Sequence, residues 1–489
     1  MSTPRILVFF GLWLVVSLVC NDKTNYGAIG IGINIGPDRI LYGVLLFEFL
    51  RQYQQSGRSV RWLVEELVCN DKTNYGAIGI GINIGPDRIL YGVLLFEFLR
   101  QYQQSGRSVR WLVEEKLMVL FFFILLVSCF AFGSAFAPHN RYLSKLFNFS
   151  IVPATLFMMS RRLIYDRRSM TVLSVFFLII GAYLGFTGVC EHYHLDAFVF
   201  PKVILDPAYG IHFDRVRGPF GQAAVMGGAL VVIGLWILWC HTALRKRWVT
   251  WLAFLPMLAS TYWTNTRGVW LQAATSIGIL AIFRNPLRKP IRVLILLLVV
   301  VYFSGVASKF SAYQTTLFGQ RHEQVDDRIN IFHASWRMFL ERPVFGFGYG
   351  NFLKYCEDYF EQLPGVELRG QGEGEHNTIL GLMCETGIVG TIPYCLIYFM
   401  FFRTCYRRFR STEAGDEMGK GVALMQFSIL AGNLVGMQVS DFGFYNYLNS
   451  LAFWTTAIVY AEFEGMTAAD TLPSGIEAPA ACCASAIAI

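Results

Sequence analysis

Two stretches decide the fold: DDRINIFHASWRMFLERPVFGFGYGNF (326–352) and GEHNTILGLMCETGIVG (374–390). The first places Arg328 at the start of an amphipathic segment, and the second places His376 just before a long apolar one. We expect both side chains at one face of a membrane. An ionisable group held beside hydrocarbon needs a partner or a purpose. A cation and a titratable ring at this level favour an enzyme that acts on a lipid-linked anionic substrate.

The composition outside these stretches is that of an integral membrane protein. The chain has 489 residues, of which 54% are hydrophobic and 15% charged, whereas a soluble domain has about 25% charged residues. The net charge of +7 comes from basic residues in short runs between apolar segments, a distribution that follows the positive-inside rule. We therefore expect membrane lipids and no nucleic acid among the partners.

Apolar windows long enough to cross a bilayer recur along the chain. They lie near 5–20, 117–137, 145–160, 169–188, 221–240, 248–264, 268–283, 292–308, 377–402, 421–438 and 448–463. Each copy of a repeat near the N-terminus adds one candidate span. With one copy crossing, we predict an all-α polytopic bundle of about 12 transmembrane helices.

The connections between the windows differ in charge. Basic loops at 161–168, 245–247, 284–292 and 403–410 fall on alternate connections, and charge bias assigns them to the cytoplasm. The opposite, external face then carries one long loop over about 309–376, which has more acidic than basic residues. A loop of this length inside a compact chain is usually functional or disordered. Its piece INIFHASWRMFLE is typical of a helix lying at the membrane surface.

The N-terminal region contains an identical tandem repeat, because residues 18–66 recur unchanged at 67–115. We take 1–115 as an N-terminal membrane segment, 116–463 as the transmembrane domain and 464–489 as a disordered cytoplasmic tail. Identity over the whole unit favours a recent duplication or an assembly error over a repeat architecture. We predict that one copy, the first, does not span the membrane, because burying charged residues in its apolar segment is costly.

His376 is the candidate general base. It lies at the start of an apolar helix, whose N-terminus attracts anions and favours the neutral imidazole, while Glu375 beside it favours the imidazolium. A histidine poised near neutrality can remove a proton from a hydroxyl group. The alternative is a histidine that only caps the loop.

Arg267 and Arg328 are the candidate anion-binding groups. A guanidinium binds diphosphate oxygens through paired donors and stays charged at any relevant pH. For Arg267, in the turn TNTRG, the alternative is snorkelling at the membrane interface. For Arg328 it is a salt bridge to Asp326 or Asp327.

The candidate substrate-binding residues are Arg215, Arg217, Glu375 and Asn377. The two arginines alternate before a Gly-Pro turn and could hold a second phosphate or a sugar acid, although ordinary loop anchoring is the alternative. Two adjacent aspartates, at 326 and 327, are a weak signal for a divalent ion, and the cysteines lack zinc-ligand or redox spacing. We expect no metal and no cofactor.

Taken together, these pieces resemble the O-antigen ligase and polymerase family of bacterial membrane enzymes, over residues 120–463. The matching pieces are TNTRG at 264–268, RVRGPFG at 215–221, Arg328 followed by ERPVFGFGYGNF at 341–352, and His376-Asn377 with Leu380 and Gly387. The chain departs from the family pattern in its duplicated N-terminal unit and its rather short external loop.

The resemblance implies transfer of a glycan, with inversion, from an undecaprenyl diphosphate carrier to an acceptor hydroxyl on a glycan, lipid or protein. The reaction would occur at the periplasmic face of the bacterial inner membrane without a required metal. His376 would remove the acceptor proton while Arg267 and Arg328 neutralise the diphosphate leaving group.

Ligase and polymerase remain open within this class, since they share the donor and differ in the acceptor. An alternative from another class is a transporter or flippase for a lipid-linked saccharide, which would show internal pseudo-symmetry and discontinuous helices near the midplane. A third possibility is a product whose duplicated segment prevents membrane insertion.

Overall fold

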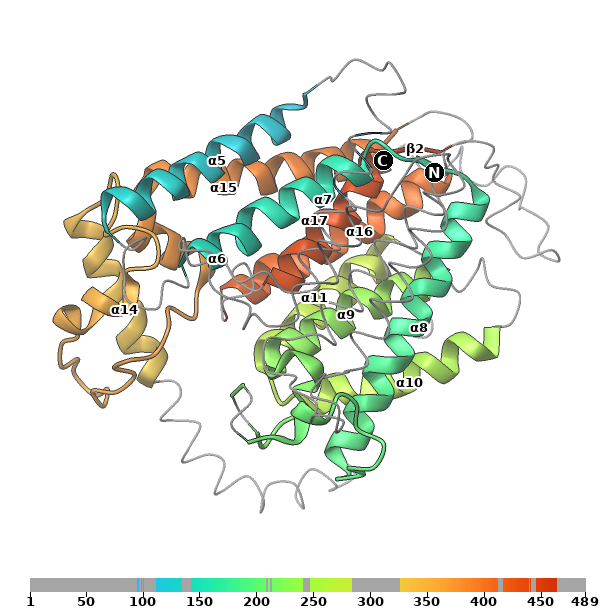
Figure 1. Cartoon of the computed structure of the whole chain (residues 1–489), viewed down its shortest axis with the longest axis horizontal. Helices are drawn as coiled ribbons and strands as arrows, with labels where there is room; N and C mark the ends of the chain where they lie inside the picture. The colour runs from blue at the N-terminus through green and yellow to red at the C-terminus, as the bar shows by residue number, and fades with distance from the viewer. Residues whose placement is uncertain are drawn as a thin grey trace, which may run out of the picture.

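The computed structural model describes residues 111–133, 142–207, 210–211, 213–240, 247–283, 326–411, 417–438, 440 and 446–463, together with Leu95, Phe98 and Arg100. Within these ranges the chain is a helical bundle (Figure 1) with one pair of two-residue parallel strands, β1 (Ile164–Tyr165) and β2 (Glu462–Phe463). The prediction of an all-α protein is confirmed in this part of the chain.

Each predicted apolar window that falls in the described residues is helical. The helices of the bundle are α5 (Val113–Ala131), α6 (Tyr142–Leu146), the π-helix η2 (Phe147–Ile151), α7 (Val152–Ser160), α8 (Arg167–His192), α9 (Ala223–Cys240), α10 (Arg247–Trp263), α11 (Arg267–Phe283), α15 (Thr378–Phe409), α16 (Glu417–Met437) and α17 (Asn446–Tyr460). The connections contain η3 (Lys202–Leu205), η4 (Gly218–Phe220), a helix over 326–341, α14 (Phe352–Tyr355) and η5 (Cys356–Tyr359).

Three of the described helices are long and apolar enough to cross a membrane: Arg168–His192, Thr378–Phe409 and Gly419–Met437. Shorter apolar helices cover Phe147–Ser160, Ala223–Trp239 and Arg267–Phe283. The windows near 5–20 and 292–308, the repeat spans, the first part of the long loop and the tail lie outside the described residues. The total of about 12 helices therefore stays a prediction.

Contacts between distant segments show which helix ends lie together. At one end, the Tyr460 hydroxyl donates to Glu114 over 2.9 Å, and β1 pairs with β2. At the other end, the amide of Tyr349 donates to Ser128 Oγ over 2.9 Å, and the amide of Val216 donates to the Trp263 carbonyl. Successive helices therefore run in alternate directions through the bundle, as the loop charges predict. We call the second end, which the loop charges predict to face outward, the external end.

A buried ionic cluster closes the first end of the bundle. The Glu115 carboxylate accepts from Arg161 at 2.6 and 2.9 Å and from Arg162 at 2.6 and 3.1 Å, and it also accepts from the amide of Leu112. None of the Glu115 side chain is exposed. Such a buried carboxylate is stable only because cations and hydrogen bonds satisfy it. The last residues of the second repeat copy are thus part of the bundle.

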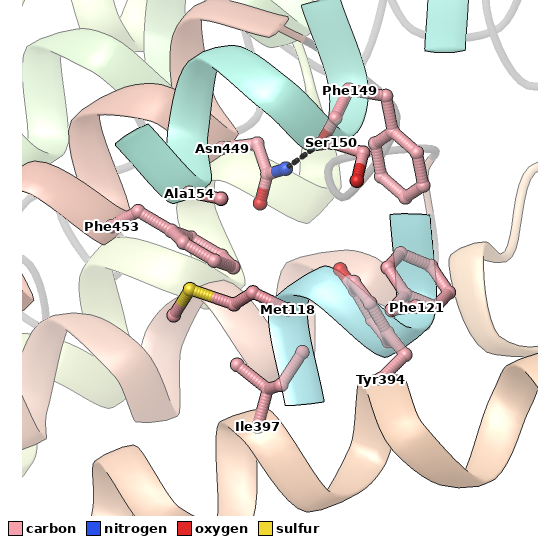
Figure 2. Close-up of a pocket in the computed structure, with 9 residues that line it drawn as sticks. All are labelled: Met118, Phe121, Phe149, Ser150, Ala154, Tyr394, Ile397, Asn449 and Phe453. Carbon is pink, nitrogen blue, oxygen red and sulfur yellow. Dashed lines mark hydrogen bonds between the residues drawn. The ribbon is translucent and has the colours of Figure 1, made fainter. Parts of the chain in front are cut away.

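The interior of the bundle offers no room for a substrate where α5, η2, α7, α15 and α17 meet. Figure 2 shows a small cavity there, where the Asn449 side chain donates to the Phe149 carbonyl over 2.9 Å. The rest of its lining is largely apolar and aromatic, with Phe121, Tyr394 and Phe453 among the side chains. The cavity has space for about one water molecule.

Candidate active site

A separate hydrophobic cluster at the external end, which we call the external core, joins the helix that begins near Arg328 to the helix that begins after His376. Its buried members are Ile331, Met338, Phe347, Phe352, Cys356, Leu380 and Cys384. They come from the helix over 326–341, from the segment that follows it and from the start of α15. The thiol of Cys384 also donates to the Ser335 carbonyl over 3.0 Å. The external core therefore makes one packed unit of the helix that carries Arg328 and the helix that follows His376.

His376 occupies a strained position immediately before α15. Its φ of +48° lies in the left-handed region, which non-glycine residues seldom adopt. The next residue, Asn377, is the N-cap of α15, and its side chain accepts from the amide of Leu380 over 2.9 Å. The cap fixes the start of the helix, and His376 makes the turn into it. Backbone strain of this kind often marks functional sites.

The surroundings of the His376 ring favour its neutral form. Burial lowers the pKa of His376 below its ordinary value of 6.5, and the positive charge of Arg328 lowers it further. Glu373 and Asp327 act in the opposite direction without reversing the shift. Arg328 and His376 therefore lie close enough in the structure to interact electrostatically. A neutral imidazole at pH 7 can accept a proton.

Arg328 lies in the first turn of its helix and is exposed. Asp327, which the sequence offered as a salt-bridge partner for Arg328, lies 3.6 Å from Arg369. The side chain of Asn330 donates to the Glu367 carbonyl over 2.6 Å, which ties this turn to the following loop. The loop that contains Glu367 and Arg369 thus holds the start of the helix and brings the Arg369 guanidinium to Asp327.

Arg267, the first residue of α11, is exposed at the same end of the bundle. Gln272 donates to Asn433 over 2.6 Å, and the antiparallel packing of α11 and α16 brings the start of α11 to the end of α16. Asn377 reaches the same place, where it donates to the carbonyl of Gln438 over 3.2 Å. The end of α16 is therefore flanked by the helix start with Arg267 and the helix start next to His376.

Gln438 and Ser440 hold the start of α15 in place, a role that the sequence did not predict. Besides its bond to Gln438, the α15 start is attached through Thr378, whose hydroxyl donates to the Ser440 carbonyl over 3.4 Å. Nothing in the sequence distinguishes a glutamine at the end of an apolar helix from an ordinary polar terminus. Glu375, the predicted substrate-binding neighbour of His376, is partly buried in the same turn.

Arg217, predicted to bind substrate, has a fully buried side chain. It donates to the carbonyls of Ile204 and Asp206 at 2.8 and 3.1 Å. The Glu191 carboxylate lies 3.8 Å from its Nε atom and accepts from the main-chain amides of Arg217 and Gly218. The structure thus places Arg217 in the support of its loop, with no exposed part toward a ligand.

Arg215 lies closer to the candidate site. Its side chain is 19% exposed and stands 3.7 Å from Asp214. The neighbouring amide of Val216 donates to the Trp263 carbonyl over 3.3 Å, so this loop is attached to the corner that leads into Arg267. The structure therefore places Arg215 near the turn at 264–268, whereas the side chain of Arg217 is buried inside its own loop.

The comparison with known families agrees with this arrangement. Residues 252–395 match the family model described as O-antigen ligase. This segment is therefore similar to the O-antigen ligase family. The resemblance inferred from the sequence is thereby confirmed for this segment. Comparison with curated proteins finds no match.

The O-antigen ligase segment contains most of the predicted site. Arg267, Arg328 and His376 lie within it, with Glu375 and Asn377. Arg215 and Arg217 precede it in the chain. The segment also includes the external core and the end of α10, so the family match and the geometry select the same region.

Proposed function

We propose that the chain transfers a glycan from an undecaprenyl diphosphate carrier to an acceptor hydroxyl, as a ligase or polymerase, at the external face of the bacterial inner membrane. The observation that carries the proposal is the O-antigen ligase match, because it spans Arg267, Arg328 and His376. The acceptor is a hydroxyl on a glycan, lipid or protein. The apolar helices agree with a membrane-bound enzyme.

In this proposal the His376 ring takes the proton from the acceptor hydroxyl as its oxygen attacks the anomeric carbon. The bond from that carbon to the diphosphate oxygen breaks from the opposite side, so the configuration inverts. Arg267 and Arg328 stabilise the negative charge that develops on the departing diphosphate. α11 starts at Arg267 and α15 starts two residues after His376, and helix N-termini favour anions.

The remaining predicted residues take supporting parts. Asn377 positions His376 through the cap of α15 and its bond to Gln438, while Glu375 contacts the sugar or the acceptor. Arg215 contacts the donor from the adjoining loop. Arg217 braces that loop, since its Nη2 group already donates to two main-chain carbonyls.

One observation bears on the transporter alternative. The backbone of α15 is non-helical at Gly387, and interrupted helices are a feature of transporters. In transporters the open half-helix ends face the substrate. Here the gap is filled from within the chain, because the amide of Ile388 donates to the Pro343 carbonyl over 2.9 Å. The interruption therefore serves the packing of the protein and favours the enzyme.

The test is a transfer assay with the purified full-length protein, a lipid-diphosphate oligosaccharide and candidate acceptors. We expect release of the carrier and a new glycosidic bond of inverted configuration. His376→Ala should reduce transfer to background while the protein still accumulates in the membrane, and a chelator should leave wild-type transfer unchanged. Normal transfer by His376→Ala would remove the general base from the mechanism.

A further inference from the structure

The break in α15 lies eleven residues after His376 in the chain. Gly387 adopts φ +60° and ψ −160°, which interrupts the helical hydrogen bonding. The amides beyond the break, of Ile388 and Val389, donate to the carbonyls of Pro343 and Val344 at 2.9 and 3.2 Å. The second half of the helix is thus completed by a segment that lies far away in the sequence.

The same segment also completes the first half of the helix. The amides of Phe347 and Gly348 donate to the carbonyls of Cys384 and Glu385 at 2.9 and 2.8 Å. Residues 343–348, which we call the inserted segment, therefore make main-chain bonds to both sides of the break. These bonds satisfy groups that would otherwise be unpaired in an apolar setting, where an unpaired amide or carbonyl is costly.

Glycine is required on both sides of this contact. A Cβ atom on Gly387 would lie 2.3 Å from the Val344 carbonyl oxygen, and one on Gly346 would lie 2.5 Å from the Cys384 carbonyl oxygen. Both glycines also have positive φ. Any larger residue would have to push the two backbones apart.

A buried carboxylate strengthens the contact. Glu385 is 4% exposed and accepts from the amide of Phe352 over 3.2 Å. The next turn of the chain is attached to the bundle, since the amide of Tyr349 donates to Ser128 Oγ over 2.9 Å. The inserted segment is therefore held by α15 on one side and followed directly by an anchor to α5.

We infer that the inserted segment is a positioning element of the active site, which holds the helix with Arg328 in register with His376. It begins two residues after that helix ends at 341, and it forms main-chain hydrogen bonds with α15 on both sides of Gly387. The external core joins the two helices mainly through apolar contacts, which are non-directional. The main-chain bonds at Gly387 fix the register. The catalytic part of this inference rests on the proposed function.

The test compares Gly346→Ala with Gly365→Ala in the full-length protein. Gly365 also has positive φ, but a Cβ atom there would meet nothing within 4 Å. The control therefore carries the backbone strain without the collision. We expect Gly346→Ala to lower kcat about 10- to 100-fold, as misplaced catalytic groups do, with little change in KM. Gly365→Ala should stay near wild type.

A second readout does not depend on activity. Diethyl pyrocarbonate modifies neutral imidazole, so the pH dependence of modification of the peptide containing His376, followed by mass spectrometry, reports its protonation. The charged groups around His376 are Arg328, Glu373, Asp327 and the adjacent Glu375. Loosening the inserted segment should expose the ring and move Arg328 away. The modification midpoint should then shift to higher pH in Gly346→Ala and stay in place in Gly365→Ala.

Glu385→Gln decides the matter if Gly346→Ala fails to accumulate, because it keeps the side-chain volume and replaces only one oxygen of the group that accepts from the amide of Phe352. A lower kcat with a shifted His376 midpoint in either variant supports the inference. Wild-type kcat and an unshifted midpoint in every variant that accumulates would overturn it. If the wild-type protein transfers no glycan but the midpoint still shifts, the proposed function fails and the positioning role stands.

Discussion

At the scale of single residues, the charge and the shape of Arg328 have separable effects. Arg328→Lys keeps a positive charge near His376 but cannot bind a diphosphate through paired donors. We expect transfer to fall at least about tenfold, which corresponds to roughly 1.4 kcal/mol of transition-state stabilisation. Arg369→Lys is the matched control, because Arg369 pairs with Asp327 and Glu367 at the protein surface. Equal rates for the two variants would contradict the role of Arg328 as a clamp.

The protonation of His376 gives a prediction about pH. A general base works only when neutral, and burial together with Arg328 holds the pKa of His376 below 6.5. Transfer should therefore be constant around neutrality and decline only below about pH 6.5, the ordinary value for histidine. Arg328→Gln removes the positive neighbour, so the acidic limb should move to higher pH. The measurement is kcat/KM as a function of pH. If the acidic decline stays at the same pH in Arg328→Gln, Arg328 does not influence the pKa of His376.

At the scale of the helix, the start of α5 tests which repeat copy belongs to the bundle. Glu115 and Glu66 are preceded by the same residues, and the structure places Glu115 against Arg161 and Arg162. Glu115→Gln should lower the free energy of unfolding by about 3 kcal/mol, because it leaves two partly buried cations without their carboxylate. Glu66→Gln should leave thermal unfolding unchanged. Equal destabilisation by both changes would contradict the assignment.

The apolar windows predicted the helices of the described bundle well, because the length of an apolar segment can be read locally and must match the thickness of the bilayer. The break at Gly387 was not foreseen, since TGIVG is compatible with a continuous helix and its partner lies at 343–348. Arg217 shows the same limit. Alternating arginines in a loop look alike whether a guanidinium meets substrate or, as here, main-chain carbonyls. Gln438 lacked any local signal. Long-range contacts, which no window of sequence contains, decided all three.

At the scale of the whole molecule, the chain should tolerate loss of one repeat unit. Deleting 18–66 or 67–115 gives the same sequence, because the copies are identical. The shortened chain still carries Trp-Leu-Val-Glu-Glu before Lys116, so the cluster of Glu115 with its arginines can form. We expect unchanged membrane accumulation, thermal unfolding and transfer. Failure of the shortened chain to accumulate would show that both copies are needed.

The pairing of β1 with β2, which joins an early part of the chain to a late one, has a consequence for biosynthesis. Arg408 donates to the carbonyls of Val459 and Ala461, and β2 at 462–463 pairs with β1 at 164–165. These partners leave the ribosome almost three hundred residues after β1 has been made. This end of the bundle therefore stays open in the membrane until residues 459–463 have been made, and a stop codon shortly before 460 should yield a protein that quality-control proteases remove.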